Sequence, residues 1–279
     1  MSAAPRVLLL TLLAMIAFAG NSLLCRAALK GTRIDAATFT TVRIVSGAIA
    51  LWILVRLRSG PRAGGSWPSA FWLFAYAIGF SYAYLTLSAS TGALLLFGAV
   101  QATMIGFGLA RGERMRALQL AGTVIALAGL GALLLPGISA PPLLGAGLML
   151  FAGFSWGLYS LRGRSAGGDP TAVTAGNFLR AAPFAIAVSA ATAPWASLDA
   201  GGILYAVASG ALASGMGYAI WYTALRGLAA TTAATVQLSV PVIAAAGGIA
   251  LLDESLTLRL ALCSTAILGG IAMTLRKPA

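Results

Sequence analysis

Charged positions in this chain are confined to short clusters that are separated by long apolar runs. The four longest stretches without any Asp, Glu, Lys or Arg are 63–110, 117–161, 200–225 and 227–252. A helix that crosses a bilayer needs about 20 apolar residues, so each of the first two stretches can hold two such helices and a turn. With turn-forming residues as boundaries, the pattern predicts ten helices: 6–26, 34–56, 67–87, 91–110, 115–136, 142–162, 171–193, 200–223, 229–251 and 257–275.

Composition supports an all-α membrane protein with ten transmembrane helices. The chain is 59% hydrophobic and 9% charged, with a mean hydropathy of +0.93, whereas soluble domains carry roughly a quarter charged residues. The first apolar run continues to Cys25. We therefore interpret it as a transmembrane helix rather than as a cleaved signal peptide.

The two halves of the chain, 1–136 and 142–279, resemble one another. Thr40–Arg43 aligns with Asn177–Arg180, and Phe80 and Tyr84 stand where Tyr218 and Tyr222 stand. Because each half has an odd number of helices, the second must enter the membrane upside down. The sequence predicts two inverted five-helix repeats, a pattern whose substrate site usually lies near the membrane midplane, between the repeats.

The basic residues predict the orientation. If the N-terminus is cytoplasmic, most of the 18 Lys and Arg residues fall on that side, and Arg26, Lys30, Arg33 and Arg259 fall on the other. This bias predicts that both termini are cytoplasmic. The net charge of +12 is spread over helix ends, so we expect no nucleic-acid partner.

Several chemistries lack the residues they need. The chain has no histidine, and its two cysteines, Cys25 and Cys263, show no disulfide or metal spacing. We expect no enzyme activity, no metal and no cofactor. All six acidic residues lie at segment ends, so no carboxylate is placed for proton coupling. Glu113 and Glu254 are expected to cap the fifth and tenth helices.

Two arginines, Arg43 and Arg180, lie near the middle of apolar segments. An arginine there costs roughly 2.5–3.5 kcal/mol on insertion scales, so each is expected to face protein or a water-filled cavity. The guanidinium groups either bind a substrate carboxylate or clamp helix-end carbonyls, and both interpretations stay open. Asn177, one turn before Arg180, and Asn21 are further polar candidates inside apolar helices.

Aromatic residues are the other candidates for substrate binding. Tyr218, Trp221 and Tyr222 share one helical face because of their spacing. They form either a cavity wall that stacks on apolar side chains or an interfacial belt. Gln237 precedes Pro241 by four residues, which predicts a kink and a hinge at Pro241, although a proline in a membrane helix can also be without a role. The remaining aromatic candidates are Tyr82, Tyr84, Trp156 and Tyr159.

These residues resemble those of the drug/metabolite transporter (DMT) superfamily, EamA type. The resemblance rests on Trp156-Gly157, on Asp169-Pro170 leading to Arg180, on Tyr218–Leu225, and on Pro241 and Glu254. It is looser in the first half, where Phe18 or Ala19 replaces the tryptophan. It implies a ten-helix exporter of the bacterial inner membrane that carries amino acids or other metabolites, with a YddG-like amino-acid exporter as the nearest subgroup.

The sequence thus predicts a monomeric transporter in the lipid bilayer with a small-molecule substrate. It would export amino acids, aromatic or hydrophobic ones above all, by alternating access and by facilitated diffusion without proton coupling. One alternative is an exporter of lipophilic cations or drugs, which would want a buried carboxylate. Another is a membrane receptor or assembly subunit that transports nothing.

Overall fold

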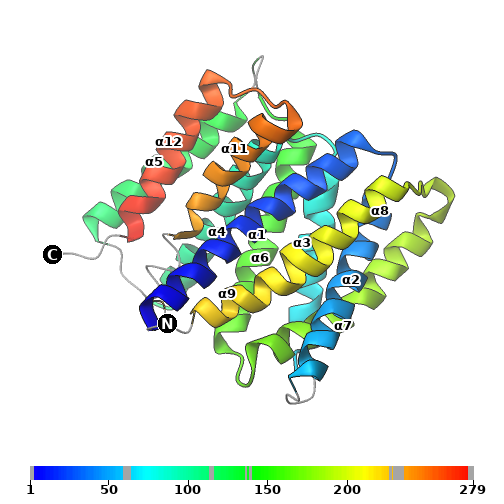
Figure 1. Ribbon diagram of the computed structural model, residues 1–279. Helices are drawn as coiled ribbons and strands as arrows, with labels where there is room; N and C mark the ends of the chain where they lie inside the picture. Colours follow the sequence, from blue (N-terminus) through cyan, green and yellow to red (C-terminus); the bar gives the residue numbers. More distant parts are fainter. Residues whose placement is uncertain are drawn as a thin grey trace.

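The structure is a bundle of long helices (Figure 1). The computed structural model describes residues 3–58, 64–112, 116–135, 137, 140–225, 228 and 236–275. The helices of the first half are α1 (Ala3–Gly31), α2 (Ala36–Leu57), α3 (Trp67–Ala83), α4 (Ala89–Ala110) and α5 (Ala117–Leu134). Those of the second half are α6 (Leu143–Ser165), α7 (Pro170–Ala191), η1 (Ala193–Trp195), α8 (Ala200–Val207), η2 (Ala208–Met216), α9 (Gly217–Leu225), α11 (Ser239–Leu252) and α12 (Leu258–Leu275).

The all-α class is confirmed, and the predicted segments reappear as helices within a few residues, except that of the segment 229–251 the described helix α11 begins only at Ser239. Seven described helices are long and apolar enough to cross a membrane, and Ser239–Leu252 and Leu258–Met273 are shorter apolar helices. The predicted segment 200–223 is one rod made of α8, η2 and α9, and η2 is a π-helix. A π segment inside an α-helix often marks a functional site.

The predicted kink at Pro241 lies close to an interruption of the helix. Of the predicted segment 229–251, residues 229–235 lie outside the described part. The helical conformation is interrupted at Leu238, and Pro241 is the third residue of the new helix α11. The first N–H groups of a helix have no partner within it, so a proline there breaks no hydrogen bond. The interruption of the helix therefore lies before Pro241, and a kink and a hinge role for this proline stay predictions.

Side chains of polar residues cap many of the helices. The Asp35, Asp169 and Asp199 carboxylates accept hydrogen bonds from backbone N–H groups in the first turns of α2, α7 and α8. Such caps are worth about 1 kcal/mol each. The expected cap of α12 by Glu254 is wrong, because this side chain caps α4 instead: Ala89 N donates to both of its oxygens at 2.9 Å. Glu113 lies outside the described residues.

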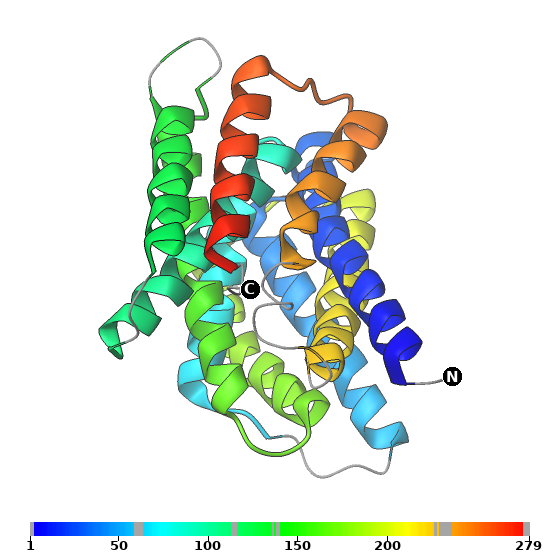
Figure 2. The same cartoon turned by 90° about the vertical axis from the view of Figure 1, so that its left-hand side faces the viewer.

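The helices run up and down the bundle in alternation. In Figure 2, α1 begins and α12 ends at the same end of the bundle, which we call the terminus end; the opposite end is the far end. Helices α5 and α12 lie side by side at one edge (Figures 1 and 2). They pack closely through Gly129 and Gly270, which touch backbone or small side chains of the partner helix. The core between the remaining helices holds the site.

Candidate functional site

An open cavity, here called the vestibule, lies at the terminus end, where α6 and α9 end and α7 begins. Its volume is about 280 Å³. The described residues that line it are mostly apolar or aromatic, with Asn177, Gln237, Ser160 and Thr174 as polar side chains and no charged residue among them. It contains five of the predicted site residues: Tyr159, Asn177, Trp221, Tyr222 and Gln237.

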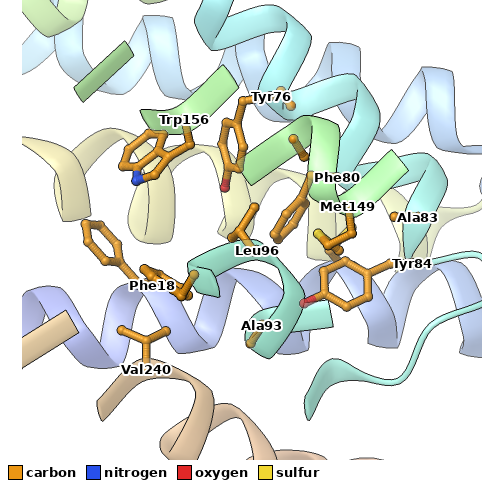
Figure 3. Packing of buried hydrophobic residues seen from close by; sticks show 14 of the residues in the cluster. Phe18, Tyr76, Phe80, Ala83, Tyr84, Ala93, Leu96, Met149, Trp156 and Val240 are labelled. Atoms are coloured by element: carbon orange, nitrogen blue, oxygen red, sulfur yellow. The ribbon is translucent and has the colours of Figure 1, made fainter. Parts of the chain in front are cut away.

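Trp221, which lines the vestibule, belongs to an aromatic layer that it forms with Phe18, Trp156 and the ring of Tyr218. Phe18 lies 6.0 Å from Trp156 and 5.8 Å from both Tyr218 and Trp221, edge to face in each case. The Trp156 and Tyr218 rings are 4.7 Å apart. Figure 3 shows Phe18 facing Trp156, with Tyr76 and Phe80 following further along the core. Each such pair stabilises the packing by about 0.5–1.5 kcal/mol beyond its buried area.

Behind this layer lies a central cluster of polar groups around Arg43, which is 1% exposed. Arg43 Nε donates to Ser214 Oγ at 3.1 Å, and Nη2 donates to the hydroxyls of Tyr76 at 3.1 Å and Tyr218 at 3.4 Å. Asn21 joins the cluster: its Nδ2 donates to Tyr76 OH at 3.1 Å. Its Oδ1 accepts from Ser209 Oγ at 2.6 Å and from Ser214 Oγ at 3.4 Å.

The π-helix η2 is what brings the two serines to this cluster. Ser209 and Ser214 both lie on η2 and are fully buried. Gly210, between them, lets the backbone of η2 approach the carbonyl of Arg43 on α2. The central cluster thus joins α1, α2, α3, η2 and α9 at one point of the bundle.

The far end of the bundle is closed by an ionic cluster. Arg26 Nε lies 3.4 Å from Glu254 Oε1, and these side chains are only 15% and 6% exposed. Arg26 Nη1 also donates to the carbonyl of Tyr84 at 2.8 Å, while Glu254 caps α4 at Ala89. Lys30 Nζ donates to the carbonyl of Leu252 at 2.9 Å. Together these contacts tie α1, α3, α4 and α11 to one another.

Asp35 joins two loops at the same end. It caps α2 through Thr38 N and accepts from Ser197 N at 2.9 Å. Burial alone would raise the pKa of the Asp35 carboxyl, but the hydrogen bonds from Thr38 and Ser197 outweigh it and hold this pKa below its usual value. The carboxylate is therefore the form that holds the loops together.

Three predicted site residues lie away from the vestibule and the central cluster. Tyr82 is half-buried near the end of α3. Tyr84 is fully buried at the closed far end, where its hydroxyl donates to the carbonyl of Ala89 at 3.3 Å. Arg180 Nη1 donates to the carbonyls of Gly64 at 2.8 Å and Gly176 at 3.0 Å. These contacts fit the second interpretation given above for the two arginines, in which the guanidinium group clamps backbone carbonyls.

Asn177 shares in this clamp, because its Oδ1 accepts from Ser66 N at 3.0 Å. We expect Arg180→Met to lower the stability of the detergent-solubilised protein by about 1.5–3 kcal/mol, the range for hydrogen bonds to charged groups. Thermal unfolding checks this. A weaker apparent affinity for solute with unchanged stability would contradict the clamp and restore Arg180 as a ligand.

Sequence reasoning missed Tyr76, whose hydroxyl is the hub of the central cluster. Tyr76, Phe80 and Tyr84 are spaced four residues apart and therefore share one face of α3. The predicted site residues Tyr82 and Tyr84 are only two positions apart and therefore point to different faces of the helix. Phe18 was considered only as a replacement for the family's tryptophan, and Ser214 was not among the site residues predicted from the sequence.

Comparisons with known proteins agree with this architecture. The chain is 59% identical over 272 residues to a Pseudomonas aeruginosa protein named uncharacterized protein PA1977. The matched region covers 97% of this chain and 94% of that relative. A solved crystal structure of a protein matches with a TM-score of 0.68 and 20% identity, over 95% of this chain and 97% of the other, which shows the fold alone. Residues 143–276 match the EamA-like transporter family. This match, which covers the second half of the chain, together with the long apolar helices identifies the chain as a multi-pass membrane transporter of the drug/metabolite transporter superfamily, with an EamA-like second half.

Proposed function

We propose that this transporter exports amino acids or closely related small metabolites, with a preference for aromatic or other apolar side chains, by alternating access. The observation that carries the proposal is the order of layers along the bundle. A vestibule open at the terminus end leads to the aromatic layer, then to the buried polar cluster, and then to the ionic closure of the far end. A carrier in a conformation that is open to one side of the membrane has this arrangement.

The chemistry of the vestibule supports a small solute with an apolar part. Its volume of about 280 Å³ lies just below the range of roughly 300–1,000 Å³ for ligand pockets. Among the described lining residues there is no carboxylate to attract a lipophilic cation. Both features favour an amino-acid-sized metabolite, as in the YddG-like subgroup, over a drug.

The positions of the carboxylates support facilitated diffusion, in which transport is not coupled to an ion. In the described part of the chain, Asp35, Asp169 and Asp199 cap helices, Asp253 ends α11, and Glu254 is held by Arg26 and α4. None of these carboxylates is among the described residues that line the vestibule or that hydrogen-bond to Arg43, although Asp169 stands between Gly168 and Pro170, which line the vestibule. With both termini in the cytoplasm, the vestibule would face the cytoplasm of a bacterial cell, and the halves 1–136 and 142–279 would move as inverted repeats about the predicted hinge at Pro241.

Counterflow in proteoliposomes tests this function. Vesicles loaded with an unlabelled solute should take up the same labelled solute without any proton or sodium gradient. The panel comprises aromatic and aliphatic amino acids and the matching 2-oxo acids. No exchange of any of these by folded protein would overturn the proposal and favour the receptor or drug-exporter alternatives.

A bulky side chain in the vestibule should block that exchange. Ser160 lines the vestibule, and we expect Ser160→Trp to reduce counterflow at least about tenfold, since a misplaced contact at a site costs 10²-fold or so. Leu144→Trp is the matched control, because Leu144 lies on the same helix and is 78% exposed. Equal rates in the two variants would show that solute does not pass through the vestibule.

A further inference from the structure

Arg43 is a buried cation whose described neighbours are all uncharged. Its hydrogen-bond partners are a serine and two tyrosines, and its Nη1 has no hydrogen-bond partner among the described residues. The salt bridges in the described part of the chain join Arg26 to Glu254 and Arg33 to Asp199. A guanidinium stays ionised in proteins. Its burial without a paired anion is unfavourable, so a site around it should favour a ligand that brings negative charge.

Aromatic rings compensate part of this charge. The Arg43 guanidinium carbon lies 4.9 Å from the ring centre of Phe80 and 5.2 Å from that of Tyr76. Cation–π contacts of this kind are each worth less than a paired carboxylate. The rings also supply an apolar wall beside the charge, which suits a solute with an apolar body and one anionic group.

A small void borders the partners of Arg43. It is lined by Asn21, Tyr76 and Tyr218 together with aromatic and aliphatic side chains, and its volume is about 10 Å³, room for about one water molecule. Phe18, Trp156 and Tyr218 of the aromatic layer line this void, while Trp221 of the same layer lines the vestibule. If movement of these rings joins the two spaces, a solute that enters through the vestibule meets the central cluster next.

The same cluster offers little to an ammonium group. Among the described residues around Arg43 there is no carboxylate, and Asn21 Oδ1 already accepts from Ser209 and Ser214. The ammonium of a zwitterion would lose water there without gaining an ionic partner, and such a loss is costly. An anion of the same shape avoids this loss.

From these contacts we propose that the central cluster is a binding site for the carboxylate of a net anionic solute with an apolar body, such as an aromatic 2-oxo acid, and that Arg43 is its counter-charge. The inference rests on the proposed function and narrows its substrate class from amino acids to their anionic relatives. A carrier of this kind moves one negative charge with each solute. The membrane potential then drives export without a coupled ion.

Phenylalanine and phenylpyruvate are the matched probes, because they share the ring and the carboxylate and differ in the ammonium. The native protein in proteoliposomes should exchange labelled phenylpyruvate at least about tenfold faster than labelled phenylalanine, with protein-free liposomes as the blank. A potassium diffusion potential of about 100 mV should change the steady-state ratio of phenylpyruvate across the membrane by up to roughly fiftyfold, since one charge is worth about 2.3 kcal/mol at that potential. The distribution of phenylalanine should not respond.

Variants of Arg43 test whether this residue is the counter-charge for the carboxylate of the solute. Arg43→Met should remove phenylpyruvate exchange, while Arg43→Lys should retain part of it together with its response to potential. Arg56→Met is the matched control, because Arg56 lies on the same helix and is exposed. If Arg43→Met fails to fold, the voltage response of the native protein still tests the anion site, and the Arg43→Lys variant still tests the role of Arg43.

Each outcome separates this inference from the function on which it rests. Phenylalanine exchanged as fast as phenylpyruvate, or phenylpyruvate exchange that ignores the potential, overturns the anion site and leaves the proposed function standing. Full phenylpyruvate exchange by a folded Arg43→Met protein also overturns the role of Arg43. If neither probe is exchanged, the anion site is overturned. The proposed function is overturned as well only if no solute of the counterflow panel is exchanged.

Discussion

Replacing Glu254 by glutamine should open the far end of the bundle and speed the reaction of Cys25 with a membrane-impermeant thiol reagent by about tenfold or more. The Glu254 carboxylate faces Arg26 and accepts two hydrogen bonds at the start of α4. Removing one partner of a buried ion pair typically costs 3–5 kcal/mol. The glutamine also loses the interaction of a negative charge with the helix N-terminus.

Cys25 reports this opening without any introduced probe. It is completely buried and precedes Arg26 on α1. The measurement uses proteoliposomes of a Cys263→Ala background, so that Cys25 is the thiol that reacts. Arg33→Gln is the matched control, because the Arg33 side chain is 87% exposed and lies 3.9 Å from Asp199, and exposed pairs contribute little. Equal labelling of Cys25 in both variants would mean that other contacts close the far end.

The ionic cluster is also connected to the vestibule through rigid helices. Helix α4 begins beside Glu254 at Ala89 and lines the vestibule at Val100 and Met104. Helix α3 passes from Tyr76 in the central cluster to Tyr84 at the far end, about 12 Å for these two turns. A movement that opens the far end must therefore shift the walls of the vestibule, which is what alternation between two open states requires.

The helices could be predicted from the sequence because they depend on a strong local signal. Long uncharged runs ended by turn residues gave helix positions that the structure confirms within a few residues for every segment except 229–251. Which residues face the centre could not be predicted as well. In a membrane helix the lipid-facing side is as apolar as the packed side, so Tyr76 and Tyr82 look alike in the sequence although one is buried in the core and the other is not.

Glu254 shows a second limit, which is contact between distant parts of the chain. Its position just before the last helix predicted a local cap, but Asp253 adopts a left-handed conformation with φ of 53°. This turn directs Glu254 N to the carbonyl of Gly248 at 3.1 Å. The side chain meets Ala89, 165 positions away in the sequence. No local pattern contains that pairing, and the same is true of the hydrogen bonds that bring Ser214 and Tyr76 to Arg43.

The contact between Gly210 and the backbone of Arg43 predicts a loss of stability when Gly210 is enlarged. A Cβ atom at Gly210 would lie 2.8 Å from the carbonyl carbon of Arg43, and closer still to its oxygen and to Ser46 Oγ. Ser46 can rotate away, but the backbone of α2 cannot. Gly210→Ala should therefore push η2 from α2 and weaken the bond from Arg43 to Ser214. Overpacking costs about 1–3 kcal/mol and sometimes more, so we expect the unfolding midpoint in detergent to fall by roughly 5–10 °C.

Gly147→Ala is the matched control for this prediction. Gly147 lies in α6, and a Cβ atom there would meet no heavy atom within 4 Å. Alanine is the better helix former by about 1 kcal/mol, so this variant should unfold at the same temperature or slightly higher. An equal midpoint in the two variants would show that α2 and η2 can separate at little cost. The central cluster would then be an adaptable site, and the close approach at Gly210 would not be what fixes the position of Arg43.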